Sequence, residues 1–414
     1  MRKQDRIHIV LKMTEVCNLG CKYCYFFEGG DVSYKADPPY ITHEMVESIG
    51  AFLSFGAKEM QLSTVEVTFH GGEPLMIGKR RFREICDILH RHVDPHAELL
   101  LTLQTNATLL DGEWIEILSL YKVGVGISLD GPEHINDAFR IDKRGKGTHK
   151  DVLRGIAALD RGTAQGLNSG FGVICVVQPD TEAVESLEHF VKILGEGIVD
   201  FRPPMMDWTN FDHQLVASTT RYYKDLVCAW IKRDNAALRL KFPSFVLAAL
   251  LSDVGAQSSA HVLLNRTRSI SIRSNGDLCP DDALVPKDIR YRHTGFNVAS
   301  SAMSDFLSAP FWSNIDVPNA TAHPECVDCR WLGICRGGPV EERYLGNLEF
   351  SSKTVYCSMR KVVFETIYEL VSSVIGRDAV DQRLEDARRA DQSHRLVESI
   401  EPPLPTSTQI TSVF

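Results

Sequence analysis

The sequence lacks several features that would place it in a special class of protein. Its longest apolar runs, such as 245–251, are far shorter than the roughly 18 residues that a membrane-spanning helix needs. It has no basic excess, since 45 Lys and Arg stand against 54 Asp and Glu, and this argues against tight nonspecific binding to nucleic acid. Its N-terminus lacks the apolar core and cleavage site of a secretory signal, which favours a cytoplasmic location away from any membrane.

The overall composition is typical of a globular protein. The chain has 414 residues, of which 44% are hydrophobic and 24% charged, and its net charge is -9. This length predicts one large domain or about two to three smaller ones, with enough core to fold without disulfides. The 11 cysteines therefore indicate metal binding or catalysis in a reducing compartment.

The first half of the chain alternates between two hydrophobic periodicities. Strands are expected in the apolar, β-rich stretches at 6–13, 64–69, 100–105, 123–129, 171–177 and 198–202. Segments with helical spacing lie between them, at 42–56, 79–93, 112–121, 148–161 and 181–195. This alternation predicts a parallel sheet, either doubly wound or a partial barrel, with a functional site at the carboxyl ends of the strands.

The pattern changes after about residue 205. Helices are expected at 216–235 and 243–252, then a turn-rich and cysteine-rich stretch, then an amphipathic helix at about 357–375. We therefore divide the chain into a β/α unit, a helical bridge, a small cysteine-rich domain, and a polar helix with a flexible tail. The bounds are 1–215, 216–267, 268–376 and 377–414.

Three cysteines lie close together after the first expected strand. They are Cys17, Cys21 and Cys24, and an aromatic residue, Tyr23, precedes the third. Three thiolates can hold three irons of a [4Fe-4S] cluster and leave one iron open to a ligand. A zinc loop is the alternative, although zinc sites usually close with four ligands. The spacing resembles the signature of the radical S-adenosylmethionine (radical SAM) enzymes.

Further motifs follow in the order that this family has. The sequence at 70–74, His-Gly-Gly-Glu-Pro, resembles the motif that holds the methionine amino group of SAM, although each such motif alone could be an ordinary turn or helix cap. The resemblance implies a SAM site formed by Tyr23, Gly71, Gly72, Glu73, Pro74, Asn106, Ser128, Asp130 and Arg140. It also implies the chemistry, in which SAM is cleaved to a 5'-deoxyadenosyl radical that abstracts hydrogen from carbon.

A second set of cysteines lies near the C-terminus. Four thiolates fit either zinc or a closed [4Fe-4S] cluster. After a radical SAM unit, their spacing resembles the SPASM extension of peptide-modifying members, which implies one auxiliary [4Fe-4S] cluster. A full extension also has cysteines at the positions of Pro339 and Asp281, so a second auxiliary cluster is expected to be absent or altered. The four ligands would be Cys326, Cys329, Cys335 and Cys357.

Several other residues are candidates for a role near the substrate. Asp282 matches an aspartate proposed as general base in sulfatase-maturing relatives, or it caps its own turn. Cys279 is a bystander, a substrate-side thiol or an alternative ligand. Arg202 and Met206 lie at or just after the end of the strand expected at 198–202, so they are expected near Asp282 at the end of the barrel where the strands terminate. The cysteines expected to be structural are Cys86, Cys175 and Cys228.

We therefore expect an α/β fold, a partial (β/α)6 TIM-type barrel followed by a small SPASM-like α+β domain. The resemblance implies a maturase that abstracts a side-chain hydrogen, from a β-carbon, of a ribosomal precursor peptide and forms an intrapeptide cross-link. His70 before the glycines, the single auxiliary ligand set and the Pro-Asp-Asp sequence at 280–282 favour a cyclophane-type carbon-carbon bond. The second electron would leave through the auxiliary cluster.

The resemblance implies two partners, the precursor peptide and an external one-electron reductant similar to flavodoxin or ferredoxin. Three alternatives stay open. One is an anaerobic sulfatase-maturating enzyme that forms formylglycine, and another is a radical SAM enzyme for small molecules. The third belongs to a different class, a non-catalytic iron-sulfur electron carrier or zinc-binding protein.

Overall fold

One sheet forms the centre of the molecule. The computed structural model describes residues 6–28, 32–167, 170–234, 237–251 and 269–400. The strand order is β7-β6-β5-β4-β3-β2-β1-β8-β9, and neighbouring strands are parallel except β8 and β9. The strands are β1 (Arg6–Thr14), β2 (Thr64–Gly71), β3 (Glu98–Thr105), β4 (Gly124–Ser128), β5 (Phe171–Val176), β6 (Gly197–Arg202), β7 (Leu238–Leu240), β8 (Ser269–Ile272) and β9 (Leu278–Cys279).

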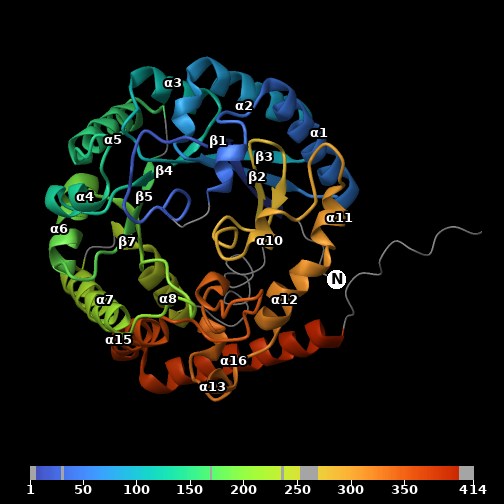
Figure 1. Ribbon diagram of the computed structural model, residues 1–414. Helices are drawn as coiled ribbons and strands as arrows, with labels where there is room; N and C mark the ends of the chain where they lie inside the picture. Colours follow the sequence, from blue (N-terminus) through green and yellow to red (C-terminus); the bar gives the residue numbers. More distant parts are fainter. Residues whose placement is uncertain (1–5, 29–31, 168–169, 235–236, 252–268, 401–414) are drawn as a thin grey trace, which may run out of the picture.

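Helices connect the parallel strands and cover one face of the curved sheet. They form an outer arc around the strands (Figure 1), as right-handed β/α connections require. They are α1 (His43–Met60), α2 (Lys79–Val93), α3 (Gly112–Leu120), α4 (Glu133–Phe139), α5 (His149–Ala164), α6 (Ala183–Leu194) and α7 (His213–Arg233). The structure therefore confirms the partial (β/α)6 barrel that the sequence predicts.

The strands of this barrel have two different faces. Side chains facing the helices, such as those of Ile7, Ile9 and Val65, are fully buried and form the core. Side chains facing the other way line a polar interior, where His8 bonds Thr68 at 2.8 Å and Thr68 bonds Thr102 at 2.7 Å. The interior therefore presents polar groups along the path to the carboxyl ends of the strands.

The C-terminal part lies across the open side of the barrel. β8 pairs with β1, α11 packs on α1, and α15 packs on α7 and α8. In Figure 1 these elements fill the space between the two ends of the arc. The helices are α8 (Lys241–Leu251), α10 (Ile289–Arg292), α11 (Met303–Leu307), α12 (Ser313–Ala320), α13 (Pro324–Val327), α14 (Leu332–Cys335), α15 (Cys357–Ile375) and α16 (Arg377–Ile400). Short 3-10 helices are η1 (Ser33–Ala36), η2 (Pro74–Ile77), η3 (Pro310–Trp312) and η4 (Val340–Glu342).

The structure adds to the expected elements in three places. β7 extends the sheet beyond β6, α4 follows β4, and β8 joins the barrel sheet instead of standing apart in the cysteine-rich region. These elements are three to seven residues long, too short for a periodicity to reveal. The expected tail at 401–414 and part of the expected bridge, 252–268, lie outside the described residues. Within the described residues, no helix has the length and apolar character needed to span a bilayer.

Candidate functional site

The first three cysteines lie on the loop that leaves the carboxyl end of β1. Cys17, Cys21 and Cys24 are free and partly exposed. The loop is fixed to the segment after α4, because the Gly20 amide donates to the Ile141 carbonyl at 2.8 Å and the Lys22 amide to the Phe139 carbonyl at 3.0 Å. The thiols are therefore presented by an ordered loop at the end of the barrel where the sequence places the site.

The Gly-Gly-Glu-Pro turn after β2 packs directly against this loop. The Gly72 amide donates to the Thr14 carbonyl and the Glu73 amide to the Val16 carbonyl, both at 2.9 Å. A Cβ atom on Gly71 would lie 2.3 Å from the Thr14 oxygen, and one on Gly72 would lie 2.0 Å from the Val16 oxygen. Only glycine permits this approach, so the two glycines set the distance between the motif and the cysteine loop.

Glu73 joins the ends of β2 and β3. Its buried carboxylate accepts hydrogen bonds from the Thr105 hydroxyl at 2.7 Å, the Asn106 amide at 2.8 Å and the Leu75 amide at 3.1 Å. Burial raises the pKa of Glu73, while these donors favour its ionised form. The Asn106 side chain in turn donates to Asn18 in the cysteine loop at 2.9 Å. Glu73 therefore positions the loop after β3, a role that sequence reasoning did not assign.

Three further candidates for SAM binding meet at the end of β4. The Tyr23 hydroxyl donates to the buried Asp130 carboxylate and accepts from Arg140 Nη1 at 2.8 Å. Burial raises the pKa of Asp130. Arg140 Nε is buried and has no hydrogen-bond partner among the described residues. A buried guanidinium N–H without a partner fits a ligand that carries a carboxylate, as SAM does. Ser128, on β4 itself, accepts from Gln104 at 2.9 Å.

The chemistry of the three thiols fits an iron-sulfur cluster better than zinc. Burial raises the pKa of Cys17 to about 12 and also raises the pKa of Cys21, so a bound cation is needed to hold them as thiolates. In the part of the chain that the structure describes, no three Cys, His, Asp or Glu side chains converge as one metal ion requires. A [4Fe-4S] cluster binds each thiolate to a different iron and so needs a wider spacing.

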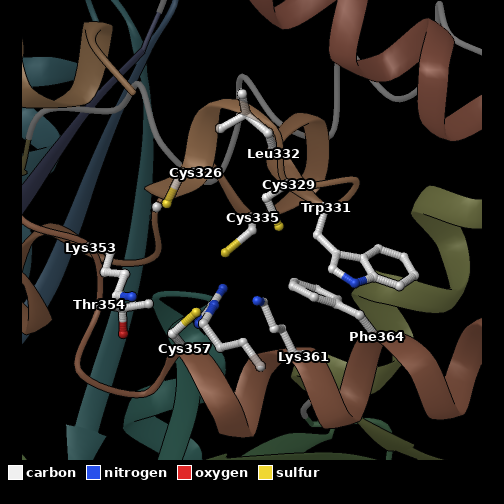
Figure 2. A pocket seen from close by; sticks show the side chains of 12 residues that line it. Cys326, Cys329, Trp331, Leu332, Cys335, Lys353, Thr354, Cys357, Lys361 and Phe364 are labelled. Carbon is white, nitrogen blue, oxygen red and sulfur yellow. The ribbon is translucent and has the colours of Figure 1, made fainter. Parts of the chain in front are cut away.

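The second set of cysteines lines one cavity between α14 and α15. Figure 2 shows Cys326, Cys329, Cys335 and Cys357 around this space, which encloses about 330 Å³ including volume open to solvent. Trp331 stacks on Phe364 in its wall, with ring centroids 5.2 Å apart. Arg360 also lines the cavity, and its buried Nε has no partner among the described residues. An unpaired donor beside four thiols fits a group with acceptor sulfides, as a [4Fe-4S] cluster has.

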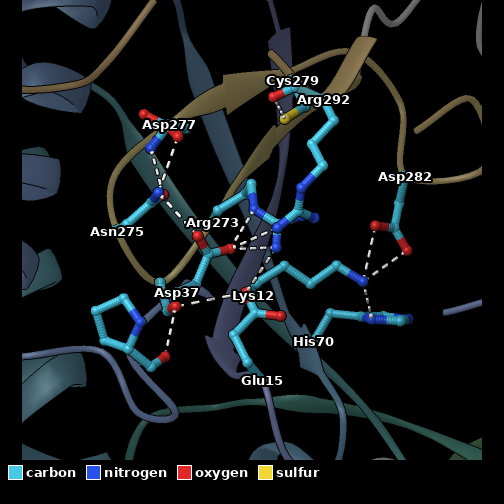
Figure 3. Close-up of polar contacts among 12 residues, drawn as sticks. Lys12, Glu15, Asp37, His70, Arg273, Asn275, Asp277, Cys279, Asp282 and Arg292 are labelled. Atoms are coloured by element: carbon cyan, nitrogen blue, oxygen red, sulfur yellow. Dashed lines mark hydrogen bonds and ion pairs between the residues drawn. The ribbon is translucent and has the colours of Figure 1, made fainter. Parts of the chain in front are cut away.

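A buried charge cluster surrounds the candidate base (Figure 3). Lys12 Nζ lies 2.7 Å from Asp282 Oδ1 and donates to His70 Nδ1 at 3.3 Å, and the Tyr25 hydroxyl donates to the Asp282 carboxylate. The ammonium also lies 4.4 Å from the centroid of the Phe26 ring. Sequence reasoning found Asp282 but missed Lys12 and Tyr25. The available signal was a lysine at a buried position of the first expected strand.

This cluster fixes the protonation of its members. Burial alone would raise the pKa of Asp282, but the Lys12 ammonium and the Tyr25 hydrogen bond bring it below its usual value, so the carboxylate is ionised. Burial, together with the Lys12 charge, lowers the pKa of His70 to about 4. Because the ammonium donates to Nδ1, the neutral imidazole carries its proton on Nε2.

The candidate base faces a small pocket and is held by a rigid hairpin. On the β8–β9 side, the buried Asp37 carboxylate pairs with Arg273 and with Arg292 at 3.0 Å, which ties the hairpin to the loop after the cysteines. The pocket beside Asp282 encloses about 280 Å³ including open solvent. Its lining residues are Tyr25, Phe26, Tyr34, Asp282, Val285, Pro286 and Arg292.

The remaining candidates are placed differently. Arg202 is half exposed, pairs with Asp200 at 3.0 Å and is within electrostatic reach of Tyr25. Met206 is buried, and its sulfur accepts from the Asp212 amide at 3.3 Å. Cys279 is buried with its thiol against the Arg292 carbonyl at 3.5 Å, as a bystander would be. The structural cysteines Cys86 and Cys175 are buried, and Cys228 is half-buried.

Comparison with known proteins agrees with this geometry. Residues 11–190 match the model of the Radical SAM superfamily. The chain contains a radical SAM domain. The cofactors of such a domain are a [4Fe-4S] cluster and SAM, so the non-catalytic alternative gives way to an enzyme of the oxidoreductase type.

Several relatives that cover most of the chain are anaerobic sulfatase maturases. A cysteine-type anaerobic sulfatase-maturating enzyme of Clostridium perfringens is 24% identical over 366 residues, which is 86% of this chain and 95% of the relative. A serine-type enzyme of Klebsiella aerogenes is 24% identical over 82% of this chain and 81% of its own length. The fold is similar to that of anSMEcpe solved with bound AdoMet and the Cp18Cys peptide. The TM-score is 0.72 at 22% identity over 89% of this chain and 98% of that one. The chain thus has a radical SAM domain and is similar over most of its length to these maturases.

Proposed function

We propose that the chain is a radical SAM peptide maturase that joins two side chains of a ribosomal precursor peptide by a cyclophane-type carbon-carbon bond. The observation that carries the proposal is the ionised carboxylate of Asp282, held by Lys12 at the mouth of the radical SAM barrel beside an aromatic-walled pocket. Relatives named as maturases of sulfatases, and a similar fold solved with a bound peptide, support a peptide as the substrate.

The proposal assigns the cofactors to particular residues. Cys17, Cys21 and Cys24 would hold the [4Fe-4S] cluster with an open iron, and the residues gathered at the ends of β2 to β4 would hold SAM. Cys326, Cys329, Cys335 and Cys357 would hold one auxiliary [4Fe-4S] cluster. When bound, these groups supply a 5'-deoxyadenosyl radical for hydrogen abstraction from a side-chain β-carbon and an acceptor for one electron.

The chain's own residues then have defined tasks. Bond closure onto an aromatic ring requires the substrate to lose, after the abstracted hydrogen atom, one electron and one proton. Asp282 accepts the proton, because it is ionised, and Lys12 holds its carboxylate in place. His70 offers an N–H at Nε2 as a fixed hydrogen-bond donor. Tyr25, Phe26 and Tyr34 form apolar walls for an aromatic side chain.

Two features of the setting belong to the same proposal. The first cluster needs an external one-electron reductant, for which a flavodoxin- or ferredoxin-like protein is the partner. The reducing cytoplasm suits a chain whose 11 cysteines are all free.

The second candidate function is formylglycine formation on a sulfatase, and the names of the relatives favour it. In that reaction the side-chain carbon is also oxidised, so the radical SAM domain would again supply the radical and Asp282 would again accept the proton. Against it stands the absence of cysteine at the positions of Asp281 and Pro339, where the full extension has ligands of an inner cluster.

Product analysis separates the two functions. Anaerobically reconstituted enzyme, SAM and dithionite are incubated with two peptides. One is the aromatic-containing core encoded by a short reading frame beside the gene, and the other is a sulfatase peptide with a target Cys or Ser. We expect the first peptide to lose two hydrogen atoms, with tandem mass spectra that show a cross-link, and the second to stay unchanged. Formylglycine in the second peptide, with no change in the first, would overturn the proposal.

A variant of the base tests the role of Asp282 in the same assay. Asp282→Asn keeps the shape of the side chain but cannot accept the proton. We expect this variant to form 5'-deoxyadenosine in the presence of the peptide but little cross-linked product. Full product yield from Asp282→Asn would remove Asp282 from the mechanism.

A further inference from the structure

Basic side chains are concentrated around the four C-terminal cysteines. Lys353, Arg360 and Lys361 all line the cavity that the thiols share. Figure 2 shows the Lys361 ammonium in the space between Cys357 and Phe364. Arg360 lies within electrostatic reach of the Cys335 thiol, and Lys361 and Lys353 lie within electrostatic reach of Cys357. Three cations therefore act on this one site.

Two of these cations follow from helix geometry. Cys357 is the first residue of α15, and Arg360 and Lys361 follow at three and four positions along the same helix. Side chains at these spacings share one face of a helix, so the residue that would bind the cluster and the two cations project together. The sequence Cys-Ser-Met-Arg-Lys thus builds a basic wall into the site.

The opposing charges differ among the three residues. Lys353 pairs with the exposed Glu325, and the buried Glu342 lies within electrostatic reach of Arg360. No ion pair is recorded for Lys361 in the described part of the chain, although the exposed Glu325 carboxylate lies within electrostatic reach of it.

The first cysteine site has a different electrostatic setting. The Glu73 carboxylate lies within electrostatic reach of Cys17 and the Asp130 carboxylate within reach of Cys21, with Arg140 as the opposing cation. A cluster gains one negative charge when it is reduced. Nearby cations therefore raise its reduction potential and nearby anions lower it, more strongly in a low-dielectric interior.

We propose that Lys361, assisted by Arg360 and Lys353, raises the reduction potential of the auxiliary cluster and thereby makes that site the acceptor of the substrate electron. This inference rests on the proposed function, because it presumes that the four cysteines hold a [4Fe-4S] cluster. One electron leaves the substrate radical and reduces the auxiliary cluster by one electron, and the accompanying proton goes to Asp282. Lys361 acts through the cluster and is a positioning charge, not a catalytic residue.

The test is a redox titration of the auxiliary cluster by itself. Replacement of Cys17, Cys21 and Cys24 by Ala removes the first cluster. The auxiliary cluster that remains is titrated anaerobically, and its reduction is followed by electron paramagnetic resonance. In this background we expect Lys361→Gln to lower the midpoint potential by about 59 mV, a tenfold change in a one-electron equilibrium. Lys361→Arg keeps the charge and should keep the potential. Lys58→Gln, at an exposed position on α1, is the matched control.

Each outcome decides between the claims. If the triple variant binds no iron, the auxiliary cluster of the proposed function is wrong. If it binds iron and the midpoint of Lys361→Gln equals that of the control, the tuning role is overturned while the cluster stands. If Lys361→Gln loses its iron, Lys353→Gln is titrated in its place and should show a smaller negative shift. Loss of iron from both Gln variants would mean that the lysines retain the cluster and do not tune it, which also overturns the inference.

Discussion

Among single residues, Lys12 carries the charge on which the candidate base depends. Its side chain is only 2% exposed, and its ammonium contacts Asp282, His70 and the face of Phe26. A buried ammonium is costly unless it is paired and hydrogen-bonded, so these contacts explain how a lysine is tolerated at a buried position of β1. The pair also explains why Asp282 is ionised although it is buried.

Replacement of Lys12 tests this dependence. Lys12→Met leaves Asp282 buried with only the Tyr25 hydrogen bond, and we expect a loss of about 3–5 kcal/mol in the free energy of unfolding. The double variant Lys12→Met/Asp282→Asn should recover much of this loss because it removes the unpaired charge. Urea unfolding of the reconstituted proteins measures both values. Equal destabilisation of the single and double variants would contradict the pairing.

The same pair predicts a direction for the pH dependence of product formation. The folded pKa of Asp282 lies below its usual value, so its stabilising contribution is present above the unfolded pKa and is lost as the pH falls through the folded pKa. Without the cation the pKa of Asp282 rises. We therefore expect the acid limb of the rate of cross-linking to move to higher pH in Lys12→Met, and an unchanged acid limb would argue against Asp282 as the base.

His70 gives a second pH signature at this scale. Its folded pKa of about 4 lies below the usual histidine value of about 6.5, so the unfolded chain binds more protons between these values. Stability should rise with pH across this window, by up to about 1.4 kcal/mol per unit from this residue. We expect His70→Gln to show a flatter dependence in urea unfolding between pH 5 and about 6.5 than the unaltered protein. Parallel curves would mean that His70 is not held neutral.

At the scale of elements, the contact between the Gly-Gly turn and the cysteine loop decides the geometry of the SAM site. A methyl group on Gly72 would overlap the Val16 carbonyl at 2.0 Å, whereas one on Gly112 at the start of α3 would meet nothing within 4 Å. We expect Gly72→Ala to lose SAM cleavage by at least about tenfold, since misplacement by about 1 Å can cost a hundredfold. Gly112→Ala is the matched control. Iron content and 5'-deoxyadenosine yield measure the effect, and normal cleavage by Gly72→Ala would contradict the account.

The elements differ in how far the sequence could predict them. The strands of the barrel and the helices between them carry strong periodicity, and the structure has them within a few residues of the expected places. β8 is only four residues long and pairs with β1 across most of the chain, so neither its length nor its neighbours reveal its partner. The Thr42 side chain caps α1 as its position suggests, accepting from the Met45 amide.

At the scale of the whole molecule, long-range contacts assemble the site from distant segments. Lys12 and Asp282 are 270 positions apart, and they meet because β8 and β9 continue the barrel sheet beside β1. Motif order could predict which residues gather at the ends of β2 to β4, since these residues follow successive strands. The partner of Asp282 and the unpaired Arg140 and Arg360 nitrogens could not be predicted, because they depend on tertiary packing that no local pattern records.

The C-terminal helix illustrates the same point. α16 packs on α14, and a Cβ atom on Gly333 would lie 2.6 Å from the backbone of Ala387. The loop that carries three of the four C-terminal cysteines is therefore pressed between α15 and α16. Sequence analysis predicted this polar helix, but its packing against α14 follows only from the three-dimensional structure.

We propose that this chain cleaves SAM at its first cysteine site and carries a second cluster at the four C-terminal cysteines. The most direct test is 5'-deoxyadenosine formation from SAM and dithionite by anaerobically reconstituted protein with the precursor peptide. The variant with Cys17, Cys21 and Cys24 changed to Ala is assayed beside it, with iron counted in both. We expect cleavage by the unaltered protein, and no cleavage but about half of the iron in the variant. An iron-loaded protein that forms no 5'-deoxyadenosine with peptide present, or a variant that still forms it, would contradict the account.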